Sequence, residues 1–314
     1  MRRNIDLISD ESFSHLTETH YDVAVFASGS NPRCTYIARH LERERINCCV
    51  ILGFDNELQD AQRQQNDEYY LGYWSHTQIA LGPDDVAPIY ESLEQLKVNA
   101  QGTLRVLVDY SSMSRMWYAG ILNWARYASW PKDIEIDFVY AVGSYKKEFL
   151  PFVIGDVVAI PGCEASPVSY PSSVAVFGLG FDGLAALCIL DILEPNVVYA
   201  YLSEPTAFEE YVTTAREHNK ELIEQHAVAT ISLPLARVET TFRYLTELIS
   251  THRSKAGITL VPMGPKPHVL AAILVGMRFE DVQCLHVGGR RQSTERVGPT
   301  GAVVATRVRL KLQQ

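Results

Sequence analysis

The sequence predicts an α/β fold built from two related halves, each with a mostly parallel β-sheet that helices cover on both faces. The main observation is a repeat: the letters VAVF at residues 23–26 return at residues 174–177, and each copy leads through small residues into a helical pattern. Three more apolar segments recur in the same order at nearly constant spacing, which indicates one supersecondary unit used twice. They are residues 49–54 with 200–205, 106–108 with 259–261, and 134–139 with 282–287. These short strands are apolar throughout, without alternating polar residues, and they alternate with helices along the chain. The sheets should therefore be parallel and covered by helices on both faces.

The first half, residues 1–142, begins with a polar lead-in over residues 1–20. The predicted strands are apolar runs at residues 21–27, 46–54, 104–108 and 134–142. Pro32 predicts the start of a helix that runs to about residue 45. Two further helices are expected over residues 85–99, where the apolar side chains share one face, and over residues 115–129.

Residues 143–172 are rich in proline and glycine and are predicted to join the halves, with a short hairpin within residues 149–160. The second half, residues 173–314, then repeats the scheme. Its predicted strands are residues 174–177, 197–202, 258–261 and 282–287, and its predicted helices are residues 183–193, 205–226, 237–253 and 267–277. The alternating apolar residues 303–310 predict an added antiparallel edge strand in this half.

The composition favours a globular protein and excludes several partners. The chain has 314 residues, of which 47% are hydrophobic and 21% charged, values typical of a protein with a sizeable core. The formal net charge of −9 argues against broad capture of nucleic acid or of a membrane surface. We expect a reducing cytoplasm and no metal site, because the six cysteines form no ligand-like spacing and no signal peptide or membrane span is evident.

Right-handed crossovers place the carboxyl ends of parallel strands on one rim, as in Rossmann-like folds. Ligands bind there, near the point where the strand order reverses. Four loops follow the strands concerned: residues 28–33, 109–115, 178–183 and 263–268. Each leads into a predicted helix N-terminus, which favours an anion. We therefore expect the loops of the two halves to form one cleft for a phosphate-bearing ligand.

The loop after the first strand offers Ser28, Gly29, Ser30 and Arg33 as ligand-binding residues, because it combines hydroxyls, a flexible backbone and a guanidinium group. It lacks the lysine-containing sequence of a Walker loop. Ser30 or Asn31 is also expected to cap the helix that Pro32 opens.

The loop at residues 109–115 is the most polar of the four. Its ligand-binding candidates are Ser111, Ser112, Ser114 and Arg115, which could hold a phosphate or ribose. Asp109 could orient a hydroxyl group or a water molecule, which makes it a catalytic candidate.

The loop at residues 178–183 fits the spacing GxGxxG, between a predicted strand and a predicted helix. That context is the one a dinucleotide-binding turn requires, so Gly178 and Gly180 are predicted to bind the ligand. Asp182 would repel a pyrophosphate unless it turned away, and Glu204 follows the next strand where an acidic ribose-binding residue is expected. Asp182 and Glu204 are the other two catalytic candidates. Alternatively, the glycines only let the strand and the helix pack closely.

The last loop contributes Gly264 and Lys266, with Lys266 held between two prolines as a projecting point charge. It could equally be a rigid turn with a surface lysine. The histidines do not converge in sequence, and no serine has a histidine and an acid arranged as a triad.

The glycine–proline–lysine–proline run from residue 264, which leads from a strand into a helix of small residues, resembles the ligand loop of CARF-type Rossmannoid domains. The polar loop at residues 109–115 takes the equivalent place in the first half. These domains are nucleotide sensors of prokaryotic antiviral systems. The resemblance implies an oligonucleotide messenger bound across a twofold axis, which is internal here, and it is confined to these loops.

Three functions remain open from the sequence. The first is a cytoplasmic binding or sensor protein for a nucleotide-like, phosphate-bearing ligand, which passes the signal to a protein partner. The second is an enzyme acting on a nucleotide or phosphosugar, with no cofactor identified. The third is an interaction subunit of a larger complex, which uses an aromatic cluster of Tyr69, Tyr70, Tyr73 and Trp74.

Overall fold

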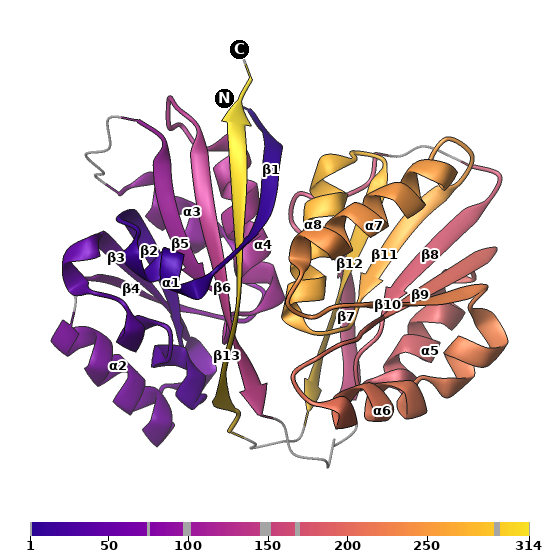
Figure 1. The fold of residues 1–314 in the computed structure, drawn as a ribbon, viewed down its shortest axis with the longest axis horizontal. Coiled ribbons are helices and arrows are strands. Elements are labelled where there is room, and N and C mark those ends of the chain that lie inside the picture. The colour runs from indigo at the N-terminus through magenta and orange to yellow at the C-terminus, as the bar shows by residue number, and fades with distance from the viewer. Residues whose placement is uncertain are drawn as a thin grey trace. The chain divides into compact units, whose positions relative to one another are not determined.

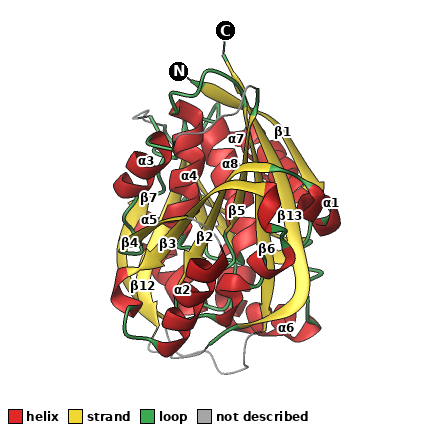
Figure 2. Ribbon diagram, turned by 90° about the vertical axis from the view of Figure 1, so that its left-hand side faces the viewer, coloured by secondary structure: helices red, strands yellow, loops and turns green. Residues whose placement is uncertain are grey.

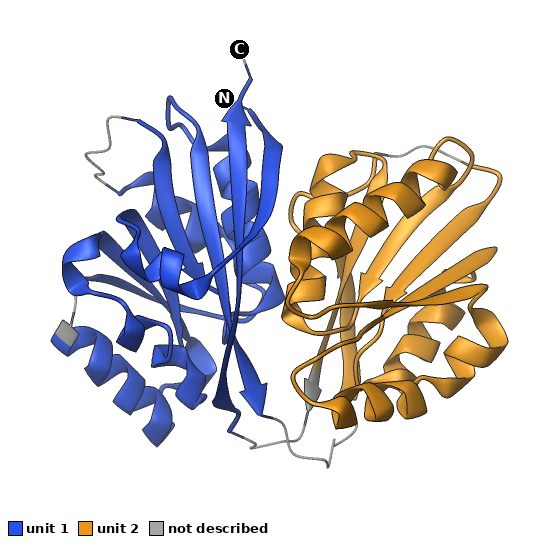
Figure 3. Ribbon diagram, viewed as in Figure 1, with its two compact units in different colours: residues 1–145, 295–314 blue, residues 146–294 orange. Residues whose placement is uncertain are grey.

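The chain forms two compact units, of which the second is inserted into the first. The computed structural model describes residues 2–73, 76–96, 102–144, 152–166, 170–291 and 296–313. Unit 1 consists of residues 1–145 and 295–314, and unit 2 of residues 146–294 (Figure 3). The polypeptide therefore leaves unit 1, completes unit 2 and returns.

Unit 1 contains a seven-stranded sheet in the order β1-β13-β6-β5-β2-β3-β4 (Figure 1). Its parallel strands are β2 (Tyr21–Ser28), β3 (Ile46–Phe54), β4 (His76–Leu81), β5 (Leu104–Asp109) and β6 (Ile134–Ser144). β13 (Gly298–Leu312) pairs antiparallel with β6 on one side and with β1 (Arg3–Glu11) on the other (Figure 2).

The faces of this sheet are covered by different helices. One face packs against α1 (Phe13–Glu18), the segment with the 3₁₀ turns η1 (Pro32–Thr35) and η2 (Ala38–His40), and α2 (Ala61–Tyr73). A third 3₁₀ turn, η3 (Arg43–Arg45), has no buried residue. α3 (Ala87–Glu94) and α4 (Arg115–Tyr127) pack together, and right-handed crossovers place them on the opposite face. A short turn, η4 (Asp55–Glu57), connects β3 to α2.

Unit 2 contains a six-stranded sheet in the order β10-β9-β8-β11-β12-β7. The parallel strands are β8 (Ser173–Gly178), β9 (Val197–Ser203), β10 (Ala229–Leu233), β11 (Gly257–Pro262) and β12 (Val282–Arg291), and β7 (Phe152–Ala159) pairs antiparallel with β12. α5 (Gly183–Leu193) and α6 (Glu209–His218), with the π-helical turn η5 (Leu222–His226), cover one face. The remaining helices of the unit are α7 (Val238–His252) and α8 (Lys266–Arg278).

The two units repeat the same arrangement, so the predicted α/β fold is confirmed. The five parallel strands follow the order β6-β5-β2-β3-β4 in unit 1 and β12-β11-β8-β9-β10 in unit 2. Numbered along the chain within each unit, the first to fifth parallel strands therefore take the same places in both sheets. This agreement is consistent with internal duplication. The strands β4 and β10 also correspond, although the sequence patterns did not predict either of them.

Several predicted elements differ from the structure. The segment after Pro32 forms 3₁₀ turns rather than a helix to residue 45, and its residues Thr35 to Ile37 are β-branched or aromatic types with low helix propensity. The long helix expected over residues 205–226 is interrupted at Asn219, whose side-chain amide donates to the Ala215 carbonyl oxygen at 2.7 Å. No hairpin forms in the described part of the joint, where β7 pairs with β12 instead.

The C-terminal segment was predicted to extend the second half, but β13 belongs to unit 1 and lies inside its sheet. Charged side chains explain this placement. Arg307 donates to both carboxylate oxygens of Asp137 on β6 at 2.8 Å, and Arg309 donates to Glu135 at 3.0 Å. Both acidic residues are buried, so moving β13 elsewhere would remove the arginine side chains that form hydrogen-bonded ion pairs with these carboxylates.

The polar lead-in at the N-terminus is also part of the sheet, as β1. Arg3 at its start is fully buried and points into the turn that follows α4. Its guanidinium group donates to the carbonyl oxygens of four residues at or beyond the end of that helix: Ala125, Ala128, Trp130 and Lys132. These carbonyls lack helical partners, so Arg3 ties β1 to the end of α4.

We expect unit 1 to fold without unit 2. Ser144 and Gly298 face each other in the register of β6 and β13, so a short turn can join these strands in place of the insertion. Replacing residues 145–295 by Asn-Gly should leave a protein that unfolds cooperatively, as followed by circular dichroism and urea titration. A product without a cooperative transition would show that unit 1 needs unit 2 for stability.

Replacing Arg3 with alanine should destabilise unit 1 by roughly 3 kcal/mol or more, because each buried carbonyl that loses its donor costs about 1–3 kcal/mol. Urea unfolding of the whole chain measures the change. Arg2→Ala is the matched control, since the neighbouring Arg2 is exposed and surface substitutions usually stay within about 0.5 kcal/mol. Equal effects of the two substitutions would contradict this role of Arg3.

Candidate functional site

Each unit has one place where its strand order reverses, and the predicted loops lie there. In unit 1 this point lies between β2 and β5, and in unit 2 between β8 and β11. The structure therefore brings residues 28–33 together with residues 109–115, and residues 178–183 together with residues 263–268. The cleft shared by both units stays a prediction.

In unit 1 the two loops meet around the buried thiol of Cys34. This thiol contacts the Gly29 carbonyl oxygen at 3.8 Å. Burial raises the pKa of Cys34, and the hydrogen bond with Ser112 opposes that rise, while the nearby Asp109 carboxylate adds to it. Residues from both loops are thus close neighbours, as the fold prediction required.

Several of the predicted ligand-binding side chains in unit 1 instead hold the backbone. Ser111 accepts a hydrogen bond from the Ala141 amide at 2.7 Å, and Arg33 donates to the Ala141 carbonyl oxygen at 3.1 Å. Asp109 accepts from the Ser111 amide at 3.0 Å. All three side chains are at least 96% buried. Ser111 and Arg33 complete the hydrogen bonding of β6 beyond the last residue of β5, and Asp109, a catalytic candidate, binds the backbone of the loop itself.

Of the two helix starts predicted beside these loops in unit 1, the one after Pro32 differs from expectation and the one at Arg115 is confirmed. Asn31 precedes the 3₁₀ turn η1 without a capping hydrogen bond from its side chain, and its side-chain oxygen accepts from the Val297 amide at 2.9 Å instead. Ser114 caps α4 by accepting from the Met116 amide at 3.2 Å. Arg115 is the first residue of that helix.

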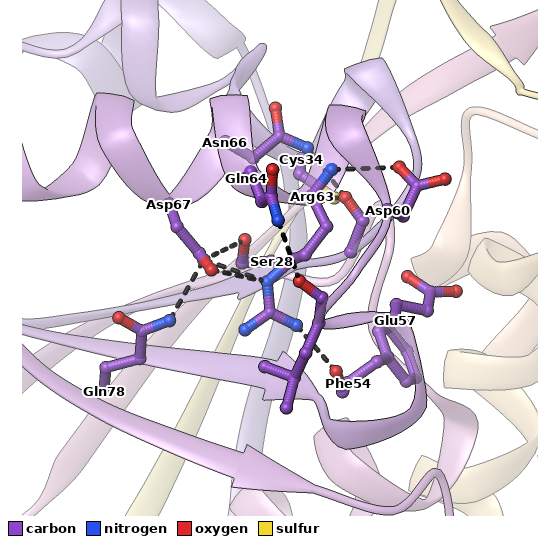
Figure 4. Close-up of polar contacts among 12 residues, drawn as sticks. Ser28, Cys34, Phe54, Glu57, Asp60, Arg63, Gln64, Asn66, Asp67 and Gln78 are labelled. Carbon is purple, nitrogen blue, oxygen red and sulfur yellow. Dashed lines mark hydrogen bonds and ion pairs between the residues drawn. The ribbon is translucent and has the colours of Figure 1, made fainter.

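The Ser28-Gly29-Ser30 turn is occupied by carboxylates of the protein itself (Figure 4). Glu57 accepts from the Ser30 amide at 2.5 Å, where a bound anion would take that hydrogen bond. Asp67 accepts from the Ser28 hydroxyl at 2.7 Å and from the Nε atom of Arg63 at 2.9 Å. The unit 1 turn therefore contains internal anions in place of an open phosphate position.

In unit 2 the GxGxxG turn has the required context, because Gly178 ends β8 and Gly183 begins α5. The glycines are also needed for packing. A Cβ atom on Gly183 would overlap the His218 carbonyl group, and one on Gly180 would lie 2.5 Å from the Met263 carbonyl oxygen. Close packing therefore accounts for these glycines whether or not a ligand binds.

At the N-termini of α5 and α8 in unit 2, the side chain of the N-cap residue makes no capping hydrogen bond. The N-cap residue is Asp182 in α5 and Pro265 in α8. Lys266 is the first residue of α8 and follows Gly264. Two helix N-termini and one lysine thus lie at the carboxyl ends of adjacent strands, an arrangement that favours a negatively charged group.

Glu204 follows the last residue of β9, directly beside β8 in the sheet. Its Oε2 atom accepts from the Nη2 atom of Arg216 at 2.5 Å and from the Ser232 hydroxyl. These hydrogen bonds lower the pKa of Glu204. The side chain is therefore an ionised carboxylate, and it is 40% exposed.

Two asparagines take equivalent places in the two units, and the sequence patterns did not predict their role. Asn66 on α2 donates to the Gly29 carbonyl oxygen at 2.8 Å, and Asn219 at the end of α6 donates to the Gly180 carbonyl oxygen at 2.7 Å. Each asparagine is preceded by an arginine three residues earlier. The signal was present in the sequence as Arg-x-x-Asn, which occurs at residues 63–66 and again 153 residues later at 216–219.

The aromatic cluster considered as an interface is only partly available. Tyr70 is fully buried in the core, and its hydroxyl donates to the Cys34 carbonyl oxygen at 2.5 Å. Tyr69 is partly buried against the same core. Trp74 lies outside the described residues, as does the Tyr73 side chain.

No protein-family model matches the sequence, and no curated protein matches it either. Within the described ranges, no helix has the length and apolar character to cross a membrane. No group of three or more His, Cys, Asp or Glu residues in the same ranges could hold a metal ion. All six cysteines are free thiols.

His268 should make unit 2 less stable in acid. Burial lowers its pKa to about 4 from the ordinary value of 6.5, although its ring contacts the Pro234 carbonyl oxygen at 3.4 Å. The folded state keeps a neutral ring, so this contribution to stability is complete above pH 6.5 and is lost as the pH falls towards 4. The shift corresponds to about 3 kcal/mol.

Urea unfolding at pH 7, 6, 5 and 4 measures this loss. His268→Gln is the comparison, because glutamine keeps an amide donor but does not titrate in this range. The native protein should lose more stability between pH 6.5 and 4 than the variant does. Parallel pH profiles would show that His268 does not carry the effect.

Proposed function

We propose that the chain is a binding or sensor protein for a nucleotide-like, phosphate-bearing ligand, held in unit 2 at the carboxyl ends of β8 and β11. The observation that carries this proposal is the GxGxxG turn from Gly178 to Gly183. It lies between a parallel strand and a helix at the point where the strand order reverses, which is the context such a turn requires.

The ligand's phosphate is assigned to the N-terminus of α5, with Lys266 supplying positive charge from the neighbouring loop. Unit 2 is preferred over unit 1 because of the difference between their turns. In unit 1 the Ser30 amide already binds the Glu57 carboxylate, and the segment that follows is a 3₁₀ turn without the dipole of a longer helix.

Asp182 bears on the choice between a sensor and an enzyme. It lies within the phosphate turn and is partly exposed, so its carboxylate either limits affinity for anions or serves as an acid or base. Asp109 is buried and engaged with backbone, which removes it from the catalytic candidates of this site. The carboxylate of Asp182 in the phosphate turn is the observation that favours the alternative function, an enzyme acting on a nucleotide or phosphosugar.

The wider setting of the proposal rests on the CARF-type resemblance of the loop at Gly264 and Lys266. From this resemblance we propose that the ligand is a nucleotide messenger and that the protein acts in a prokaryotic antiviral system, in the cytoplasm and with a protein partner. The six free thiols agree with a reducing compartment. Exposed apolar side chains on α5, such as Leu184 at 77% exposure and Ile192 at 65%, are compatible with a partner.

The experiment is a thermal-shift series with ribonucleoside mono-, di- and triphosphates, followed by mass spectrometry of each incubated nucleotide. Stabilisation without conversion supports a sensor, and conversion supports the enzyme. Inorganic sulfate at the same ionic strength serves as the control for unspecific anion effects. If no nucleotide raises the melting temperature beyond the sulfate control, the proposal is wrong.

Lys266→Ala should weaken nucleotide binding roughly tenfold, because a charge-assisted hydrogen bond contributes about 1.5–3 kcal/mol. The matched control is Arg115→Ala, since Arg115 begins α4, the helix of unit 1 that corresponds to α8. Isothermal titration calorimetry measures both affinities. A loss with Arg115→Ala but not with Lys266→Ala would move the site to unit 1.

A further inference from the structure

The outer face of α5 has a row of exposed apolar side chains. Leu184, Cys188 and Ile192 are four residues apart, so they lie in one row along the helix. Leu184 is 77% exposed and Ile192 65%, and Cys188 is exposed as well. Asp191 is the single charged residue of this helix. A helix that is apolar on all sides is normally buried on all sides, so the exposed row is the kind of surface that a partner covers.

The layer that contains α5 holds most of the net charge of the protein. Residues 182–226, which form α5, α6, η5 and the strand β9, include nine acidic and two basic residues. This segment therefore has a formal charge of −7, against −9 for the whole chain. All acidic side chains within α5, α6 and η5 are exposed, namely Asp191, Glu209, Glu210, Glu217 and Glu224.

The acidic side chains lie beside the apolar row. α5 and α6 are neighbours in this layer (Figure 1), because Gly183 at the start of α5 packs against the His218 carbonyl group at the end of α6. Arg216, one of the two basic residues of the segment, is already paired with Glu204 at 2.5 Å. A partner with lysine or arginine side chains complements this surface, whereas a second copy of the chain or an anionic lipid surface would add negative charge to it.

We propose that the outer face of α5 docks a basic amphipathic helix of a partner protein. The apolar side chains of that helix pack against Leu184, Cys188 and Ile192, and its lysine or arginine side chains face the carboxylates of α6 and η5. The partner is the one that the sensor function proposed above requires, so its role rests on that function. The docking itself needs no nucleotide.

The geometry of the row determines the form and the strength of the contact. Side chains four residues apart form a ridge that fits between the same rows of a second helix. α5 has 11 residues and is about 16 Å long, so the contact involves about three turns of the partner. Interfaces of this size bury less than about 1,200 Å² and belong to weak, transient complexes. We therefore expect a dissociation constant on the order of 10 μM or higher.

The test uses a fluorescein-labelled 18-residue peptide of leucine and lysine, with the leucines on one face of a helix. Its binding to the whole chain is measured by fluorescence anisotropy without nucleotide. The peptide should bind, and a version with glutamate in place of lysine should not. The double variant Leu184→Ser/Ile192→Ser should weaken binding roughly tenfold or more. Leu71→Ser is the matched control, because Leu71 on α2 of unit 1 is 68% exposed, and it should leave the affinity unchanged.

Cys188 reports where the peptide docks. It is exposed, whereas the other five cysteines are buried or half-buried. Bound peptide should slow the alkylation of Cys188 by N-ethylmaleimide, as followed by mass spectrometry. Asp191→Lys should weaken binding roughly threefold or more at low ionic strength, because it places a positive charge next to the row.

Three results would overturn the inference. The first is the absence of peptide binding. The second is binding that survives the Leu184→Ser/Ile192→Ser substitutions or leaves the alkylation of Cys188 unchanged, which would show charge attraction without a docking site. The third is a dimer of the chain alone, seen by sedimentation, that dissociates in the double variant and thus assigns the row to a second copy. The phosphate site is judged separately, since peptide binding without nucleotide binding would support the docking surface and contradict the sensor function.

Discussion

One hydrogen bond from an asparagine side chain to a glycine carbonyl oxygen in each unit connects the loops at the sheet edge to a neighbouring helix. Gly29 and Gly180 lie just beyond the ends of β2 and β8, where no neighbouring strand can donate to their carbonyl oxygens. Asn66 and Asn219 supply the missing donors, and both side chains are 2% exposed. A buried carbonyl without a donor costs about 1–3 kcal/mol, so this bond fixes the helix that follows the second strand against the turn that follows the first.

The strands that could be predicted from the sequence are those with apolar residues along most of their length. β2, β5, β8 and β11 form the centre of their sheets, and their uniform hydrophobicity revealed both the parallel sheets and the repeat. β1, β4 and β10 lie at edges, where strands contain polar residues and lack that signal. β13 was recognised as a strand but placed in the wrong half, because its partners Glu135 and Asp137 are distant in sequence and only their burial creates the need for Arg307 and Arg309.

The candidate site was predicted as a set of loops but not as a set of contacts. The predicted strands and helices placed all four loops at the carboxyl ends of parallel strands, where the structure also has them. The sequence patterns could not show that Ser111 and Arg33 form hydrogen bonds with the backbone of Ala141, or that Glu57 accepts from the Ser30 amide, because these contacts join segments that are distant in the sequence. The repeated Arg-x-x-Asn sequence is a polar signal of the same repeat, because its spacing of 153 residues matches that of the strands.

The insertion of unit 2 has a consequence for biosynthesis. β1 precedes unit 2 in the chain, yet its neighbour in the sheet is β13, which follows unit 2. The inner unit can therefore finish while the outer one still has two open strand edges, at β1 and β6. Exposed edges invite pairing with other chains. Until β13 is made, unit 1 is therefore the unit more exposed to pairing with other chains.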